Sequence, residues 1–220
     1  MYKRIKNALH VWFVFNLYNL RNFITGGNSQ WLYYTSSDYK QIANNLVKNM
    51  QLGDHAKILD LGCGSGGMLV YLNKINTNFK LYGVDINSLS ISQAQKNLPS
   101  ASFYASSCDD LHFLENDTID ACIIFGVLNY LTVEQVEKTI HEVIRVSKRG
   151  GQILILNNYE EKHHNKKSWG TYPLPDNYWE SLTHDVALDI QYLDMEEFCA
   201  VRKYEGNAVK ISLRQTTTEG

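Results

Sequence analysis

The chain has 220 residues, 44% of them hydrophobic, and a formal net charge of −2 at pH 7. That length buries a full core and favours one domain, residues 1–220. The basic residues are scattered, so the concentrated positive field of a nucleic-acid-binding protein is missing. The four cysteines include no C-x-x-C pair, which gives no sign of a metal site or of a disulfide framework. We expect a cytoplasmic protein without a nucleic-acid partner or a bound metal.

An amphipathic helical pattern covers the first 24 residues. His10, Asn16 and Asn19 interrupt the apolar run, which is shorter than the roughly 20 residues that a bilayer span requires. We therefore expect a helix that packs on the protein, and no membrane association. The apolar side chains recur at three- and four-residue spacing: Ile5, Leu9, Trp12, Phe13, Leu17, Leu20 and Ile24.

The next predicted helix covers residues 38–50. Its apolar side chains again recur at helical spacing, so one face should lie against the sheet just before the first strand. They are Ile42, Leu46, Val47 and Met50.

A strand, a glycine-rich loop and a helix follow one another from residue 57 to residue 72. Four glycines stand within positions 62–67, directly after an apolar run. Glycine tolerates positive φ and lets a ligand approach the backbone, and the helix that follows presents unpaired N–H groups. The pattern G-x-G-x-x-G is also matched, by Gly62, Gly64 and Gly67. We expect a nucleotide-like ligand at this loop.

Two acidic residues end the first two predicted strands. Asp60 comes two residues before the first glycine of the loop, where it can meet a ligand ammonium directly or through water. Asp85 ends the strand that begins at Lys80 and can accept hydrogen bonds from both hydroxyls of a ribose. Sites for NAD and for S-adenosylmethionine share this requirement, so Asp85 leaves both open.

Helices and strands continue to alternate as far as residue 156. Asn87 or Ser88 can cap the next helix, and Pro99 ends it. Thr132 and Gln135 match a capping box at the start of a later helix. The predicted elements are helices at 88–98 and 133–146 and strands at 103–105, 119–125 and 152–156.

Four stretches of this series resemble the class I S-adenosylmethionine-dependent methyltransferases: residues 58–66, 83–85, 119–125 and 145–155. The resemblance implies S-adenosyl-L-methionine as cofactor and an α/β fold with a doubly wound, mostly parallel seven-stranded sheet. Two later runs with strand composition, 186–193 and 208–213, match the C-terminal antiparallel hairpin of that Rossmann-like methyltransferase fold.

The resemblance also implies which residues hold the cofactor. After the third strand the family often places an acid that binds the adenine, and here Ser107 aligns best with that acid, so Asp109 is one candidate beside it. The implied residues are Asp60, Gly62, Cys63, Gly64, Gly66, Asp85, Ile86, Cys108, Asp109 and Phe125.

A polar, aromatic stretch without a clear period follows the fifth strand. Loops of this length inside a compact domain tend to be lids or binding segments. His163 or His164 can act as a general base, because imidazole changes protonation near neutral pH. The alternative is a hydrated charge cluster. Candidate acceptor-binding aromatics in this stretch are Tyr159, Trp169 and Tyr172.

The segment before the first strand is commonly used in this family to cover the cofactor and the acceptor. We therefore interpret residues 1–37 as an N-terminal helical cap or lid, with a helix packed on the core as the alternative. The glycines at 26 and 27 precede further candidate acceptor-binding aromatics: Trp31, Tyr33 and Tyr34.

These features lead to the hypothesis of an enzyme that transfers the methyl group of S-adenosylmethionine to an oxygen or nitrogen atom of a small molecule. A nicotinamide-dependent oxidoreductase and a noncatalytic S-adenosylmethionine-binding partner or regulator are the alternatives. The sequence identifies neither the acceptor nor the oligomeric state.

Overall fold

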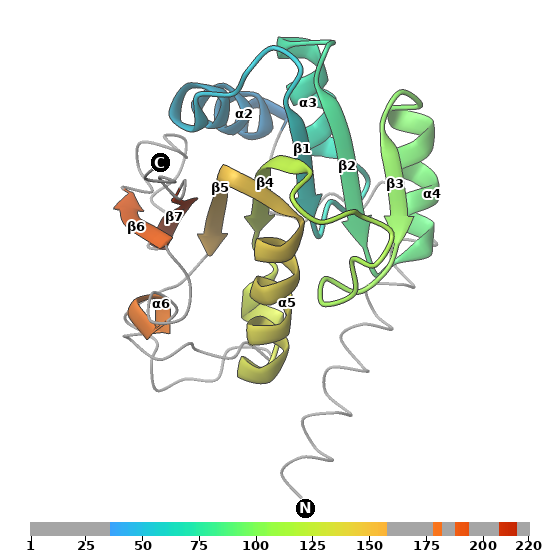
Figure 1. Ribbon diagram of the computed structural model, residues 1–220. Coiled ribbons are helices and arrows are strands. Elements are labelled where there is room, and N and C mark those ends of the chain that lie inside the picture. Colours follow the sequence, from blue (N-terminus) through green and yellow to red (C-terminus); the bar gives the residue numbers. More distant parts are fainter. Residues whose placement is uncertain (1–35, 158–177, 182–187, 194–206, 215–220) are drawn as a thin grey trace, which may run out of the picture.

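The computed structural model describes residues 36–157, 178–181, 188–193 and 207–214. Seven strands form one sheet in the order β3-β2-β1-β4-β5-β7-β6 (Figure 1). The strands are β1 (Lys57–Leu61), β2 (Lys80–Asp85), β3 (Ser102–Ala105), β4 (Ile119–Phe125), β5 (Ser147–Asn157), β6 (Leu188–Leu193) and β7 (Asn207–Leu213). β1 to β5 pair in parallel, whereas β7 pairs antiparallel with both β5 and β6. The predicted fold class is confirmed, including its C-terminal antiparallel hairpin.

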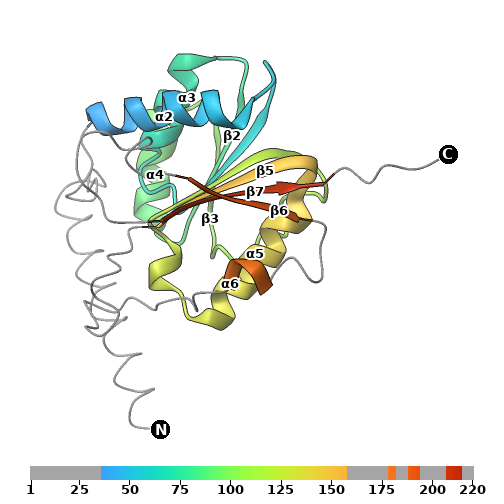
Figure 2. The ribbon, with the colours of Figure 1, turned by 90° about the vertical axis from the view of Figure 1, so that its left-hand side faces the viewer.

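Helices cover both faces of this sheet (Figure 2). They are α2 (Ser36–Met50), α3 (Gly67–Ile75), α4 (Ser88–Asn97), the 3₁₀ turn η1 (Leu128–Tyr130), α5 (Val133–Val146) and the short α6 (Tyr178–Ser181). Because successive side chains of a strand point to opposite faces, the apolar strands supply two separate cores. Ile58 packs with α2, α3 and α4 on one face, and Leu59 packs with α5 and α6 on the other.

The helix ends follow the local sequence signals. Asn87 caps α4, and its side-chain oxygen accepts from the N–H groups of Leu89 and Ser90. Thr132 and Gln135 form a complete capping box at the start of α5. α2 begins at Ser36, two residues earlier than the spacing predicts, so it takes the last two residues of the range 1–37.

β5 is longer than the predicted strand at 152–156. Its pairing with β4 shifts from Ile119↔Ser147 to Ala121↔Gln152, so the extra residues of β5 bulge between those two pairs. A Cβ on Gly151 would lie 2.7 Å from the carbonyl oxygen of Lys148, which only glycine avoids. The sequence prediction starts this strand at residue 152, because a glycine pair such as Gly150-Gly151 signals a turn and a bulge alike.

Gly83 in β2 lies under two buried side chains. A Cβ there would come within 2.5 Å of a Phe103 ring carbon and 2.8 Å of the Cys63 sulfur. We expect Gly83→Ala to lower the free energy of unfolding by about 1–3 kcal/mol, because Phe103 and Cys63 have to shift. Chemical denaturation followed by circular dichroism measures the change.

Gly53 offers a matched control, because no described heavy atom lies within 4 Å of a Cβ placed there. Gly53→Ala should leave the unfolding midpoint nearly unchanged. Equal effects of the two substitutions would contradict the close packing over Gly83.

Candidate functional site

The candidate site lies at the carboxyl ends of the parallel strands. β1 stands at the point where the strand order reverses, with β2 on one side and β4 on the other. In open α/β sheets the crevice at this switch point is where ligands bind. The loop from β1 to α3 crosses this edge of the sheet (Figure 1), so its glycines lie where ligands bind in such sheets.

Three glycines of this loop have left-handed backbone conformations but different surroundings. The φ values of Gly62, Gly64 and Gly66 are 74°, 51° and 79°. A Cβ on Gly62 would lie 2.2 Å from a Val127 methyl carbon, and one on Gly66 would lie 3.2 Å from Ala94 and from Phe103. Among the described residues, nothing lies within 4 Å of a Cβ on Gly64. Gly62 and Gly66 therefore serve packing, whereas Gly64 adjoins open space.

Asp85 is held by the backbone of the same loop. One carboxylate oxygen accepts from the N–H of Gly64 at 2.9 Å, and the other accepts from the N–H of Asn87 at 2.8 Å. Burial raises the pKa of Asp85, and these two hydrogen bonds act in the opposite direction. The neighbouring Ile86 side chain is 63% exposed. This edge therefore combines an oriented carboxylate with an apolar surface.

Asp60 carries a second carboxylate into the same edge. Its side chain is only 3% exposed, and within the described part of the chain no group donates a hydrogen bond to it. Burial, with a smaller contribution from the charge of Asp85, raises the pKa of Asp60 to about 8. A buried carboxylate without a donor is costly, so this position suits a ligand that brings its own positive charge.

Comparison with known proteins agrees with this geometry. The family model described as a methyltransferase domain matches residues 58–151, from β1 into β5. The match therefore includes the glycine-rich loop and both acidic strand ends. Residues 58–151 form a class I S-adenosylmethionine-dependent methyltransferase domain.

Relatives of this methyltransferase are distant. An uncharacterised methyltransferase of Synechocystis is 26% identical over 75% of this chain and 78% of its own length. Protein 235L of Invertebrate iridescent virus 6 is 21% identical over 76% of this chain, which spans 66% of the viral protein. The fold resembles a TehB-like S-adenosylmethionine-dependent methyltransferase from Corynebacterium glutamicum, with a TM-score of 0.60, 18% identity and coverage of 91% and 96% of the two chains.

The residues at the strand ends of this methyltransferase fit its cofactor. The carboxylate of Asp60, which accepts no hydrogen bond from the described residues, suits the ammonium of the methionine part. Asp85 has lone pairs left for ribose hydroxyls. The open space at Gly64 and the exposed side chain of Ile86 match the approach of the ligand and the apolar face of adenine.

Two thiols also lie in this region. Burial raises the pKa of Cys108 to about 12, and it raises the pKa of Cys63 as well. Both are thus protonated thiols at neutral pH, which suits packing better than nucleophilic attack. The Ser107 hydroxyl donates to the Asp109 carboxylate, so the two candidates for the adenine position lie side by side.

The other candidate residues lie outside the part of the chain that the structure describes. Their assignments as general base or acceptor-binding residues stay predictions, and so does the cap or lid at residues 1–35. They are Trp31, Tyr33, Tyr34, Tyr159, His163, His164, Trp169 and Tyr172. No helix among the described residues is long and apolar enough to cross a bilayer.

Sequence reading missed Val127, which fills the space above Gly62. It follows β4 by two residues, but nothing in the local pattern tells which glycine it meets. Sixty-five positions separate Val127 from Gly62 along the chain, so only the pairing of β1 with β4 brings them together.

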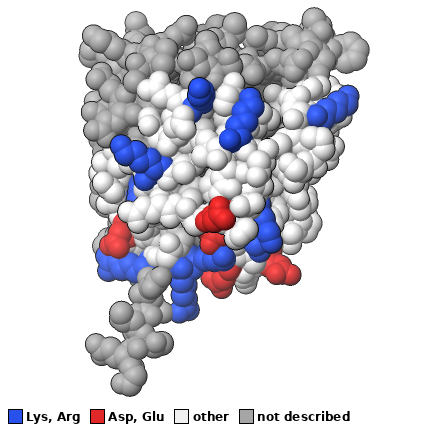
Figure 3. Space-filling model, turned by 90° about the horizontal axis from the view of Figure 1, so that it is seen from above, with Lys and Arg blue, Asp and Glu red and all other residues white. Residues whose placement is uncertain are grey.

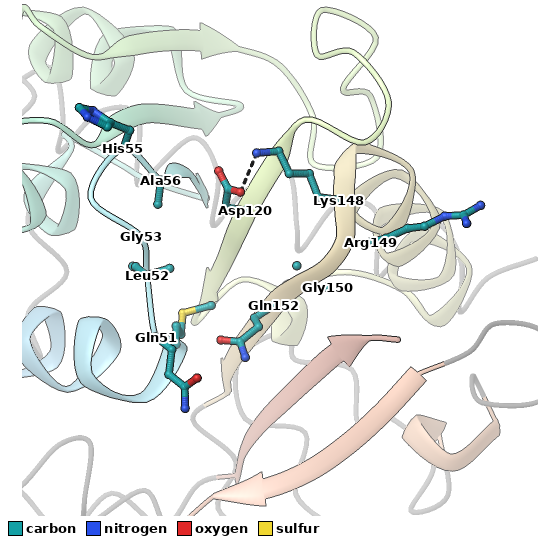
Figure 4. A pocket seen from close by; sticks show the side chains of 12 residues that line it. Gln51, Leu52, Gly53, His55, Ala56, Asp120, Lys148, Arg149, Gly150 and Gln152 are labelled. Atoms are coloured by element: carbon teal, nitrogen blue, oxygen red, sulfur yellow. Dashed lines mark hydrogen bonds and ion pairs between the residues drawn. The ribbon is translucent and has the colours of Figure 1, made fainter. Parts of the chain in front are cut away.

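A hollow of about 410 Å³ lies at the opposite, amino-terminal end of the sheet (Figure 4). The Lys148 ammonium contacts the Asp120 carboxylate at 2.7 Å there, and the other Asp120 oxygen accepts from the N–H of Lys57. These contacts join the starts of β1, β4 and β5. Seen from this end, Lys and Arg side chains are scattered and acidic side chains lie among several of them (Figure 3). We therefore assign this hollow no part in methyl transfer.

The raised pKa of Asp60 predicts a pH-dependent stability of the ligand-free protein. The folded protein keeps a proton between about pH 4 and pH 8 that the unfolded chain has already released, so stability falls as the pH rises through this window. Asp60→Asn removes the titration. We expect the variant to unfold at a higher temperature than the wild type at pH 8, with a difference that shrinks towards pH 4.

Thermal melts from pH 4 to pH 9 measure this effect. Glu115→Gln, which replaces an exposed carboxylate, should keep the wild-type slope. Parallel curves for Asp60→Asn and the wild type would show that Asp60 is ionised throughout.

Proposed function

We propose that this methyltransferase transfers the methyl group of S-adenosylmethionine to an oxygen or nitrogen atom of a small molecule. The buried carboxylate of Asp60 and the half-buried carboxylate of Asp85, beside an open glycine, carry the cofactor part of this proposal. When bound, S-adenosylmethionine supplies a methyl group activated on a sulfonium centre.

In the proposed site, Asp60 pairs with the ammonium of the methionine part. Ionisation of this buried side chain becomes favourable when a positive charge comes within a few ångströms. Asp85 accepts from the ribose hydroxyls, and its hydrogen bonds to Gly64 and Asn87 hold it in place without any ligand. The missing side chain at Gly64 admits the ligand to the backbone.

The exit of β4 provides the acceptor side of the proposed site. Phe125 ends this strand and is half-buried, and Gly126 follows with a φ of 65°. The N–H of Gly126 donates to the Leu156 carbonyl at 2.8 Å, so the chain turns here while anchored to β5. Tyr130, 39% exposed, ends the 3₁₀ turn that follows. Catalysis then rests mainly on holding the acceptor atom in line with the methyl group.

A small molecule is the acceptor that the charge distribution favours. The formal net charge is −2, and the basic residues are scattered along the sequence. A protein that binds RNA neutralises several phosphates and needs a basic patch. Some relatives are named as RNA methyltransferases, so RNA is the acceptor class to test against.

Loss of the Asp85 carboxylate should weaken cofactor binding. Asp85→Ala removes hydrogen bonds to a charged group, each worth about 1.5–3 kcal/mol, so we expect S-adenosylhomocysteine to bind ten- to a hundredfold more weakly. Isothermal titration measures the affinity, and circular dichroism checks that the variant is folded.

Glu115→Ala is the control, since this carboxylate is exposed and lies outside the Ser107–Asp109 turn. This control variant should bind S-adenosylhomocysteine as tightly as the wild type. Normal binding by Asp85→Ala would move the ribose elsewhere, and binding of NADH in place of S-adenosylhomocysteine would favour the nicotinamide-dependent alternative.

The acceptor class can be tested with tritium in the methyl group of the cofactor. We expect label in the small-molecule fraction of a cell extract and none in its RNA or protein fraction. Asp85→Ala should lose most of this label at a limiting cofactor concentration. Label in the RNA fraction would overturn the small-molecule proposal and leave methyl transfer intact, and absence of label from every fraction would favour a noncatalytic binding protein.

A further inference from the structure

The connection from β3 to β4 carries the residues proposed for adenine. It covers residues 106–118 without a helix or a strand, and Ser107, Cys108 and Asp109 lie near its start. A connection of this kind needs partners for its backbone polar groups and anchors for its position. The position of the Ser107–Asp109 turn relative to Asp85 therefore depends on these anchors.

The turn is compact in itself. The Ser106 hydroxyl donates to the Asp110 carbonyl at 3.0 Å, and the N–H of Asp110 donates to the Ser107 carbonyl at 3.1 Å. Its front end is attached by one backbone hydrogen bond, from the N–H of Ser106 to the Asp85 carbonyl at 3.2 Å. The position of the turn therefore depends on how its other end, at Leu111, is held.

One arginine of α5 holds that other end. The Arg145 guanidinium donates to the carbonyl oxygens of Leu111 and Leu114 at 3.0 and 3.1 Å, and to the side-chain oxygen of Asn116 at 2.7 Å. A guanidinium is planar and presents several donors in a fixed geometry, so it ties three points of one loop at once. A lysine cannot reproduce this arrangement.

Glu142 orients this arginine and adds a bond of its own. Its two carboxylate oxygens accept from Nε and Nη2 of Arg145 at 2.7 and 2.8 Å, which is a two-point pairing. One of these oxygens also accepts from the N–H of Leu111 at 3.0 Å. Both polar groups of the Leu111 backbone are thus bound by the Arg145–Glu142 pair.

Apolar contacts position the connection, and the Arg145–Glu142 pair determines the direction of the turn. Leu111 and Leu114 are buried in the core beneath α5, and the Phe113 ring stacks on Tyr104 of β3 at 4.1 Å between centroids. Such packing places the middle of the connection. Hydrogen bonds to Leu111 define the angle at which the chain leaves the Ser107–Asp109 turn, because they are directional.

We propose that Arg145 is a positioning residue for adenine recognition. Through Leu111 it keeps the Ser107–Asp109 turn in its bound orientation before the cofactor arrives, although Arg145 itself never touches the ligand. This inference rests on the proposed assignment of the turn to the adenine amino group. Preorganisation of this kind improves affinity by lowering the ordering cost of binding.

The test compares two ligands in titration calorimetry, S-adenosylhomocysteine and S-inosylhomocysteine, which has an oxygen in place of the adenine amino group. We expect R145Q to bind S-adenosylhomocysteine about tenfold more weakly than the wild type and to lose most of the preference between the two ligands. R145K should lie between the two proteins. Circular dichroism and thermal melts establish that each variant is folded at the titration temperature.

K138Q is the matched control, because Lys138 lies on the same helix and pairs with Glu134 in an exposed i,i+4 ion pair. It should keep both the affinity and the preference. A folded R145Q with wild-type affinity and preference would overturn the positioning role, even if its melting temperature were lower. A wild type that binds both ligands equally would overturn it as well, whereas a wild type that binds neither would instead refute the proposed function.

Discussion

Close packing at Gly62, Gly66 and Gly83 lets side chains of neighbouring elements lie against the carboxyl ends of β1 and β2. At each position a Cβ would come within 2.2 to 3.2 Å of a neighbouring side chain. This packing draws the loop between β1 and α3 over the sheet, and it brings the N–H of Gly64 to the Asp85 carboxylate. The geometry of the whole cofactor edge depends on these positions having no side chain.

Electrostatics at this edge follow from the packing. Asp60 lies opposite Gly83 in the pairing of β1 with β2, and Asp85 is two residues further along β2. Two carboxylates at adjacent strand ends repel each other, and burial removes the water that would screen them. Asp60 therefore keeps its proton up to about pH 8 in the ligand-free protein, and a cation beside it would favour the ionised form. Perturbed pKa values of this kind cluster at functional sites.

α5 has a structural role and also supports the candidate site. Val136, Ile140 and Val143 of this helix pack against the sheet. Its last turns carry Glu142 and Arg145, which reach across to the connection between β3 and β4. A helix whose sequence predicts only a packing role thus also supports the Ser107–Asp109 turn, beside the proposed cofactor site.

The sequence by itself determined the order of the elements and the two acids at the strand ends, whereas the cofactor class came from the resemblance to a known family. These are local features: strand and helix periods, the glycine cluster, and the caps at Asn87 and Thr132 all depend on neighbours within a few residues. The bulge in β5 escaped this reading, because Gly150 and Gly151 satisfy a turn and a bulge equally well.

Only the tertiary structure decided what each glycine and each charge does. Gly62, Gly64 and Gly66 look alike in sequence. Yet Val127 fills the space at Gly62 and Phe103 the space at Gly66, whereas no described residue fills the space at Gly64. Likewise nothing near Arg145 in the sequence points to Leu111. Such assignments depend on contacts between residues about thirty or more positions apart, and these contacts exist only after the sheet has paired and α5 has docked on it.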